Sequence, residues 1–286
     1  MSTANHRGRH TAPPSPRAPA GFHQATPVQI VILAAGMGTR LGRPLPKALT
    51  PLRDGRTILQ HQLDGVRAAF GRTAQVTLVV GYKADVLRNA ARDAAFVDNP
   101  DYARTNTSKS LWRALVASRP GGVLWLNGDV VFEPAILEHL VPVVRADQSF
   151  VCVDTASVSD EEVKYTIDAA GFLHELSKTV VGGLGEAIGI NYVSAADKPV
   201  LIGHLAQCDD SDYFERGLET AIAVHGMRIR PLDISAFAAV EVDFEEDLVR
   251  ANERCVPAAG AWASSGAAGP PRGSGRSPAP PAPPSP

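Results

Sequence analysis

The sequence predicts an α/β fold, a three-layer sandwich in which helices cover both faces of a mostly parallel central sheet. Short apolar segments typical of buried parallel strands alternate with longer segments whose apolar residues recur at helical spacing. In the middle of the chain this alternation gives way to short segments typical of antiparallel strands. The chain has 286 residues, 44% of them hydrophobic, which is ordinary for a protein with a sizeable core.

We expect one folded domain over residues 27–256. Residues 1–26 are rich in Pro, Ala, His and Arg, and residues 257–286 consist almost wholly of Pro, Ala, Gly and Ser. Such segments bury too little apolar surface to offset the entropy lost on ordering, so both are expected to be disordered tails.

Composition argues against several partners and locations. A formal charge of −2 leaves no basic footprint for nucleic acid. No apolar run approaches the roughly 20 residues of a membrane span, and no hydrophobic stretch follows the N-terminal arginines as a secretory signal would require. The cysteines are odd in number and lack metal-type spacing, which favours a reduced cytoplasmic setting; they are Cys152, Cys208 and Cys255.

The first predicted element is a buried strand, residues 28–33, that runs into a loop suited to phosphate. Residues with almost no side chain follow the strand, so the backbone can approach a ligand closely and its free N–H groups can form an anion-binding nest. Cationic residues come next. The small residues are Ala34, Ala35, Gly36 and Gly38, and the cations are Arg40, Arg43 and Lys47.

Two well-known phosphate loops do not fit this segment. The P-loop pattern GxxxxGK[ST] is absent. The glycines at positions 36, 38 and 42 miss the Rossmann spacing, because Leu41 stands where the third glycine belongs. On the loop residues alone, an ordinary structural turn stays open as an alternative.

Alternating helices and strands are predicted after the loop. They occupy, in order, residues 58–70 (helix), 76–80 (strand), 86–94 (helix), 96–97 (strand), 111–116 (helix) and 123–126 (strand). Ligands of parallel sheets bind beyond the carboxyl ends of the strands, so the small-residue loop and Asp129 are expected to share a rim. A carboxylate at such a place suits Mg²⁺, which takes few protein carboxylates along with phosphate oxygens. A turn or capping aspartate is the alternative.

The second half of the chain is predicted to begin with antiparallel strands. The expected strands are residues 150–154, 162–168 paired with 172–178, and 186–190. Near the C-terminus, residues 240–244 alternate as a strand does. The acids that follow, Glu245, Glu246 and Asp247, are interpreted as first-turn residues favoured by a helix dipole.

Residues 33–41, LAAGMGTRL, and residues 46–49, PKAL, resemble a specific signature. It is the LAAGxGxRL…PKxL signature of the nucleotidyltransferase superfamily that forms sugar nucleotides and CDP-alcohols, the MobA-like NTP transferase fold. Asp129 after its strand and the segment Glu241-Val242-Asp243 match two further motifs of that superfamily. The resemblance covers about residues 28–252 and implies a Rossmann-like, GT-A-like sandwich.

The resemblance also implies roles for individual residues. Arg40 and Lys47 would be catalytic, by offsetting negative charge on the phosphates. Many relatives place a DxD pair where this chain has Asp129 and Val131, so the second Mg²⁺ ligand would be Asp243. The nucleotide would contact Leu33, Ala34, Ala35, Gly36, Gly38, Gly81 and Ser108. For Ser108, capping of the helix that follows is the alternative.

Within the superfamily, the middle segment resembles the cytidylyltransferase branch that activates phosphocholine, aminoethylphosphonate and related acceptors. Three motifs of that branch have counterparts in this chain: its EEVKV corresponds to EEVKY at residues 161–165, its ISK to LSK at 176–178, and its GExIGI to GEAIGI at 185–190. This implies that Lys164 and Lys178 bind the acceptor phosphate and that Glu186 holds a polar or cationic group. A solvated strand lysine is the alternative for either lysine.

The function implied is the transfer of a nucleoside monophosphate, CMP from CTP, to a small phosphorylated or phosphonate acceptor, with Mg²⁺ as cofactor and release of pyrophosphate. One alternative is a sugar-1-phosphate nucleotidyltransferase that makes a UDP-, dTDP- or GDP-sugar. Another is a nucleotide-binding protein without activity. The acceptor and the oligomeric state, a homodimer included, stay open.

Overall fold

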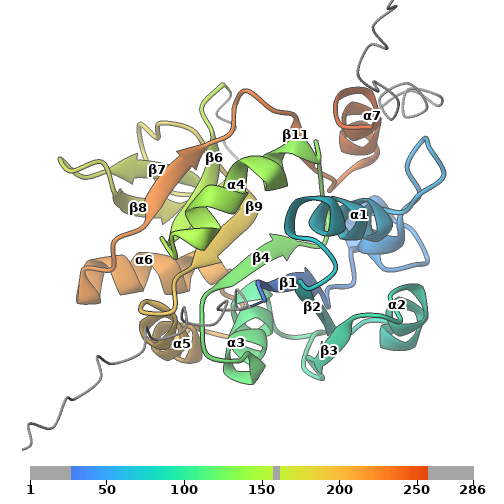
Figure 1. Cartoon of the computed structure of the whole chain (residues 1–286), viewed down its shortest axis with the longest axis horizontal. Helices are drawn as coiled ribbons and strands as arrows, with labels where there is room; N and C mark the ends of the chain where they lie inside the picture. Colours follow the sequence, from blue (N-terminus) through green and yellow to red (C-terminus); the bar gives the residue numbers. More distant parts are fainter. Residues whose placement is uncertain (1–26, 157–161, 257–286) are drawn as a thin grey trace, which may run out of the picture.

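A twisted sheet runs through the middle of the protein (Figure 1). The computed structural model describes residues 27–156 and 162–256, so the tails expected at 1–26 and 257–286 and the Glu161 of the EEVKY motif lie outside the described residues. The order of strands along the sheet is β10-β6-β9-β4-β1-β2-β3. Their bounds are β1 Gln29–Ala34, β2 Gln75–Val80, β3 Ala95–Asp98, β4 Val123–Asn127, β6 Phe150–Asp154, β9 Glu186–Val193 and β10 Arg230–Asp233.

The strand directions confirm a mostly parallel sheet. β1 runs parallel to both of its neighbours, β2 and β4, and the β2–β3 and β6–β10 pairs are parallel too. Of the seven strands in this order, β9 is the reversed one, because it lies antiparallel between β4 and β6. Since β1 and β4 are adjacent and parallel, their carboxyl ends meet at one edge of the sheet, as the sequence predicted.

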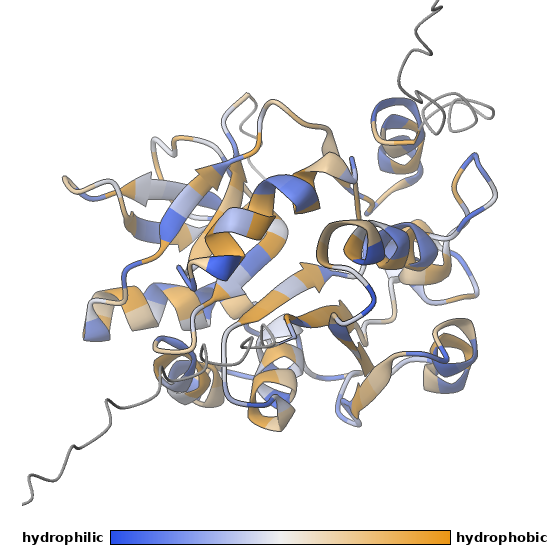
Figure 2. Ribbon diagram, in the orientation of Figure 1, coloured by the Kyte–Doolittle hydropathy of each residue, from blue (hydrophilic) through white to orange (hydrophobic). Residues whose placement is uncertain are grey.

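Helices cover both faces of the sheet, and alternate residues of β1 face the two layers. Ile30 and Ile32 pack in one apolar cluster with α1 (Ile58–Phe70), α2 (Ala84–Ala90) and α4 (Ala135–Arg145). Val31 and Leu33 pack in a second cluster with α3 (Thr107–Ala117), α5 (Lys198–Gln207) and α6 (Phe214–His225). The central strands are accordingly among the most hydrophobic parts of the ribbon (Figure 2).

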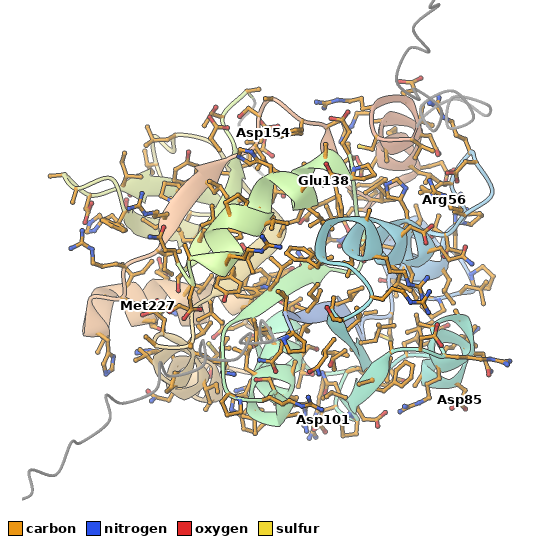
Figure 3. The ribbon with its side chains drawn as sticks, in the orientation of Figure 1. Arg56, Asp85, Asp101, Glu138, Asp154 and Met227 are labelled. Carbon is orange, nitrogen blue, oxygen red and sulfur yellow. The ribbon has the colours of Figure 1, made fainter. Side chains whose placement is uncertain are left out.

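The outer sides of the helices are polar. Asp85 on α2 and Glu138 on α4 are exposed, and Asp85 lies on the side of α2 away from the sheet (Figure 3). This division into an apolar inner face and a charged outer face is what the helical spacing of apolar residues requires. Among residues 27–156 and 162–256, none of the helices combines the length and the apolar character that a bilayer crossing needs.

Smaller elements surround the carboxyl edge. Two 3₁₀ turns, η1 (Thr39–Leu41) and η2 (Lys47–Leu49), follow β1, and β7 (Lys164–Ile167) and β8 (Leu173–Ser177) form a hairpin beside β9. β5 (Val130–Phe132) pairs antiparallel with β11 (Ala239–Glu241), which leads into α7 (Glu245–Arg254). β11 and α7 thus lie side by side at this edge (Figure 1).

Several expected boundaries were wrong, including the following three. The helix predicted at 86–94 ends at Ala90, because Ala91 leaves helical geometry at φ −133° and the chain turns to place β3 beside β2. The strand predicted at 240–244 is shorter, since only residues 239–241 find a partner in β5. The strand predicted to end at residue 190 continues to Val193, because its apolar residues are buried between β4 and β6.

Candidate active site

A cavity of about 310 Å³ opens at the carboxyl edge of the sheet, beyond β1 and β4. Of the residues that the sequence assigned to a site, nine line this cavity: Leu33, Ala34, Gly36, Gly38, Arg40, Lys47, Asp129, Lys178 and Asp243. These residues come from five separate parts of the chain. The fold therefore gathers them at the rim that the parallel strands predict.

The loop after β1 follows the cavity wall with its backbone. Gly38 has φ 61°, a left-handed conformation that glycine adopts without strain, and it begins η1. A Cβ added at Gly38 would lie 3.0 Å from Lys47 Cβ, closer than side-chain atoms normally approach. Gly38 thus allows the loop to pass directly over the stem of Lys47.

Gly81 and Ala35 support the loop from behind and do not line the cavity. Tyr82 donates its backbone N–H to the carbonyl oxygen of Ala35 at 3.0 Å. A Cβ at Gly81 would lie 2.8 Å from that same oxygen and 2.6 Å from Tyr102 Cβ. Gly81 is therefore placed to let the end of β2 approach the loop.

Lys47 joins the two carboxylates that the sequence proposed as metal ligands. Its Nζ lies 2.9 Å from Asp129 Oδ2 and 2.5 Å from Asp243 Oδ1, and the Lys47 side chain is only 14% exposed. Arg40 Nη1 lies 2.7 Å from the other oxygen of Asp243. Two cations and two carboxylates thus form one connected cluster at the cavity wall.

The cluster shifts the pKa values of its members. Burial raises the pKa of Asp243, but the hydrogen bond and charge of Lys47, followed by the charge of Arg40, outweigh burial and hold that pKa below its usual value. Burial lowers the pKa of Lys47, and the charges and hydrogen bonds of Asp129 and Asp243 raise it above its usual value. Lys47 and Asp243 are therefore both charged near neutral pH.

Local structure fixes the position of Asp243. The β5–β11 pairing continues past β11, because Val242 donates its N–H to the carbonyl oxygen of Asp129 at 3.0 Å. Asp247 Oδ2 then accepts the N–H groups of Asp243 and Phe244 at 2.9 and 2.8 Å. Asp247 is thus an N-terminal capping residue of α7, in keeping with its interpretation as a first-turn acid.

The donor set fits a magnesium ion. Asp129 and Asp243 both reach one ammonium nitrogen, so a single small cation can be shared between them. In the described part of the chain, no three His, Cys, Asp or Glu side chains are arranged to hold a metal. Mg²⁺ commonly completes its shell with water and substrate phosphate oxygens, so two carboxylates suffice when a nucleotide supplies the rest.

Three other predicted residues lie outside the cavity. Ser108 is completely buried within α3, where its Oγ has no partner among the described residues, and the neighbouring Asn106 and Thr107 line the cavity instead. Lys164 and Glu186 lie directly opposite each other on β7 and β9. Lys164 packs there against Gly183, where an added Cβ would lie 2.8 Å from Lys164 Cβ.

The structure adds acidic residues that sequence reasoning did not assign to the site. Glu162, Glu215 and Glu241 line the cavity from the segment before β7, the first turn of α6 and β11. Burial raises the pKa of Glu215 to about 7. Burial and then the charge of Glu186 raise the pKa of Glu162, and burial and then the charge of Asp129 raise that of Glu241.

A sequence signal existed for only part of this set. Glu241 stands in the E-V-D segment and Glu162 just before β7, whereas Glu215 looks like any other first-turn acid. Tyr213, two residues before Glu215, also lines the cavity. Its ring makes a cation–π contact with Lys178, whose Nζ lies 5.4 Å from the ring centre.

Solved structures share the fold. The inositol-1-phosphate CTP transferase from T. maritima aligns over 81% of this chain and 99% of its own, with a TM-score of 0.65 and 16% identity. The CTP:phosphocholine cytidylyltransferase from Streptococcus pneumoniae aligns over 79% and 98%, with a TM-score of 0.63 and 18% identity. At such identities the likeness establishes the fold alone.

Two sequence comparisons go further. The chain is 34% identical over 265 residues to the CMP-5'-(3-aminopropyl)phosphonate synthase of Streptomyces rubellomurinus (strain ATCC 31215). That alignment covers 82% of this chain but only 40% of the relative, which is a much longer protein. Residues 30–204, which hold the glycine loop, Lys47 and Asp129, match the model of the MobA-like NTP transferase domain, and the protein is a member of that family.

Proposed function

We propose that this protein is a Mg²⁺-dependent nucleotidyltransferase that transfers CMP from CTP to a small phosphate or phosphonate acceptor and releases pyrophosphate. The observation that carries the proposal is the contact of Lys47 with both Asp129 and Asp243, beside the small-residue loop after β1. Cations, carboxylates for a metal and a backbone nest are the groups that a triphosphate requires.

The reaction needs no nucleophile from the protein. An oxygen of the acceptor phosphate or phosphonate attacks the α-phosphorus of CTP, the bond from that phosphorus to the bridging oxygen breaks, and pyrophosphate leaves with the electron pair. Catalysis then consists mostly of positioning and charge stabilisation. The backbone from Leu33 to Gly38 would hold the triphosphate, and Arg40 and Lys47 would neutralise the charge that develops on it.

Mg²⁺ would be held by Asp129 and Asp243, and it would supply positive charge to the phosphate oxygens. Lys178, which also lines the cavity, would bind the phosphate or phosphonate of the acceptor. Lys164 and Glu186, on the strands beside the cavity, would support that end of the site rather than touch the substrate.

We propose CTP and a phosphonate acceptor because the relative that is 34% identical has a name that describes a CMP-phosphonate product. The middle motifs of the sequence favour the same branch. We further propose that the protein works in the reducing cytoplasm, where its three cysteines, none of them in a disulfide, would be kept reduced.

Pyrophosphate release with Mg²⁺ and CTP tests the proposal. The acceptors to compare are 2-aminoethylphosphonate, phosphocholine, inositol 1-phosphate and glucose 1-phosphate. Release with one of the first three supports cytidylyl transfer. Release with glucose 1-phosphate alone, or only with another nucleotide, would move the protein to the sugar-nucleotide branch, and no release with any pair would overturn the proposal.

A further inference from the structure

One region of the cavity wall is unusually acidic. Glu162, Glu215 and Glu241 reach it from three elements that are far apart in the sequence. In the described part of the chain, no lysine or arginine forms an ion pair with any of the three, although thirteen other pairs are formed there. Neighbouring carboxylates without an ion-pair partner disfavour one another's ionisation, so a bound cation would stabilise them in the charged form.

Glu215 is the residue in which the lack of a partner is clearest. Its Oε2 is fully buried and accepts no hydrogen bond from the described residues. A buried carboxylate oxygen without a donor is costly for the folded protein. A role in the first turn of a helix does not require this, because Glu246 holds the same position in α7 with an exposed side chain.

The residues around Glu215 suit an organic cation, because an aromatic ring lines this part of the cavity together with the carboxylates. An ammonium group on a short chain is larger than a bare ion and brings three N–H donors, so it can serve carboxylates that are spread along a wall. Tyr213, which precedes Glu215, already attracts a cation, since its ring lies under Lys178 Nζ.

Lys178 supplies the complementary charge. Its charge lowers the pKa of both Glu162 and Glu215, so it lies within electrostatic reach of the two, yet it forms an ion pair with neither. An acceptor that is anionic at one end and cationic at the other would satisfy Lys178 and the glutamates at the same time.

We propose that Glu215 and Glu162 form a subsite for the ammonium group of a zwitterionic acceptor, an aminoalkyl phosphonate or phosphate ester whose anionic end binds Lys178. This deepens the proposed nucleotidyl transfer and rests on it. The subsite makes Glu215 a residue that determines acceptor specificity, because an acceptor of the same size that lacks the ammonium group leaves its carboxylate unpaired.

Binding tests the subsite without requiring turnover. 2-Aminoethylphosphonate and 2-hydroxyethylphosphonate are titrated by calorimetry into the full-length protein with Mg²⁺ and a non-hydrolysable CTP analogue. The two ligands differ mainly in ammonium against hydroxyl. We expect the amino ligand to bind the unmodified protein about 10-fold tighter or more, and Glu215→Gln to bring the two affinities within about 3-fold of each other.

Matched variants make the result specific. Glu219→Gln lies one turn further along α6, where Glu219 pairs with Arg216 and does not line the cavity, so it should keep the preference. Glu162→Gln is the second test should Glu215→Gln fail to fold, and it should weaken the preference too. Phosphocholine is also compared with 3,3-dimethylbutyl phosphate, in which a carbon atom replaces the quaternary nitrogen. This pair shows whether a quaternary cation is accepted. Tighter binding of the cationic ligand in either pair supports the subsite.

Several results would overturn it. Equal binding of the amino and hydroxy ligands to the unmodified protein would do so, as would a preference that survives both glutamine substitutions. Binding of the CTP analogue with no binding of any acceptor would do so as well. If the subsite fails but pyrophosphate is still released with an acceptor that lacks an ammonium group, the proposed nucleotidyl transfer stands without the subsite. If the ammonium group is recognised but no pyrophosphate is released, the proposed reaction is what fails.

Discussion

Lys47 Nζ and Asp243 Oδ1 lie 2.5 Å apart, although 196 residues separate them in the chain. The same nitrogen reaches Asp129, so one ammonium group neutralises both proposed metal ligands. Mg²⁺ held by Asp129 and Asp243 would add positive charge beside Lys47, and the lysine and the metal would then both serve phosphate oxygens.

Replacement of Lys47 by alanine should remove most of the activity. Because the lysine would stabilise charge on the phosphates, we expect Lys47→Ala to lower kcat by about 10²–10³-fold with an unchanged circular dichroism spectrum. Arg43→Ala is the matched control, since Arg43 lies in the same loop but pairs with Glu245 and does not line the cavity. Near-normal turnover by Lys47→Ala would refute its role.

Alanine variants of two glycines in the loop can distinguish the effect of backbone strain on stability from the effect of displacing Lys47 on activity. Gly38 and Gly42 have nearly the same φ, 61° and 66°, but only Gly38 has Lys47 within 4 Å of an added Cβ. Both alanine variants should lose about 1 kcal/mol of stability, measured by thermal unfolding. Gly38→Ala should also displace Lys47 and lower kcat/KM by about 10-fold or more relative to Gly42→Ala. Equal kinetics in the two variants would contradict this.

The magnesium requirement should depend on both carboxylates. We expect Asp129→Asn and Asp243→Asn each to raise the Mg²⁺ concentration for half-maximal activity by about 10-fold or more, and excess chelator to abolish activity in the unmodified protein. Glu245→Gln, which changes an exposed carboxylate just beyond Asp243, should leave the requirement unchanged. A shift in only one aspartate variant would assign the metal to that residue alone.

Glu215 should make the stability of the protein depend on pH. Its pKa is about 7 in the folded protein against an ordinary 4.5, so the folded state holds a proton that the unfolded state has released. Stability is therefore lost as pH rises from about 4.5 to 7 and the loss stays constant above that, at up to about 3 kcal/mol.

Glu215→Gln removes this loss. The variant should be more stable than the unmodified protein at pH 8, and the difference should disappear near pH 4.5; chemical denaturation at the two pH values measures it. A variant that is less stable at pH 8 would show that the Glu215 carboxylate has a partner in the folded protein, which would also count against the ammonium subsite.

The fold could be predicted from the sequence because its signals are local. The apolar runs that became β1, β2 and β4 are each bounded by turn residues, and strands that alternate with helices in this way form parallel sheets. The place of β9 could not be predicted, because its insertion between β4 and β6 is decided by contacts with strands that are distant in the sequence. Local propensity carries no information on such pairings.

The site residues, too, fall into those that the local sequence pattern could place and those that it could not. Leu33 to Lys47 and Asp129 follow strand ends and could be placed from the pattern alone. Glu215 could not, because nothing in its neighbourhood distinguishes a half-buried first-turn acid from an exposed one such as Glu245. Ser108 illustrates the opposite case: its loop reaches the cavity, but helical geometry turns that residue inward and presents Thr107 instead.

The arrival of Asp243 from a segment 203 residues beyond Arg40 has a kinetic consequence. Contacts between segments so far apart form late, because closing long loops is entropically unfavourable until the rest of the chain is compact. β1 to β4 can assemble early and already carry the glycine loop, Lys47 and Asp129. On refolding from denaturant, recovery of catalysis should therefore lag behind recovery of helical signal, since the last carboxylate docks onto a sheet that is already formed.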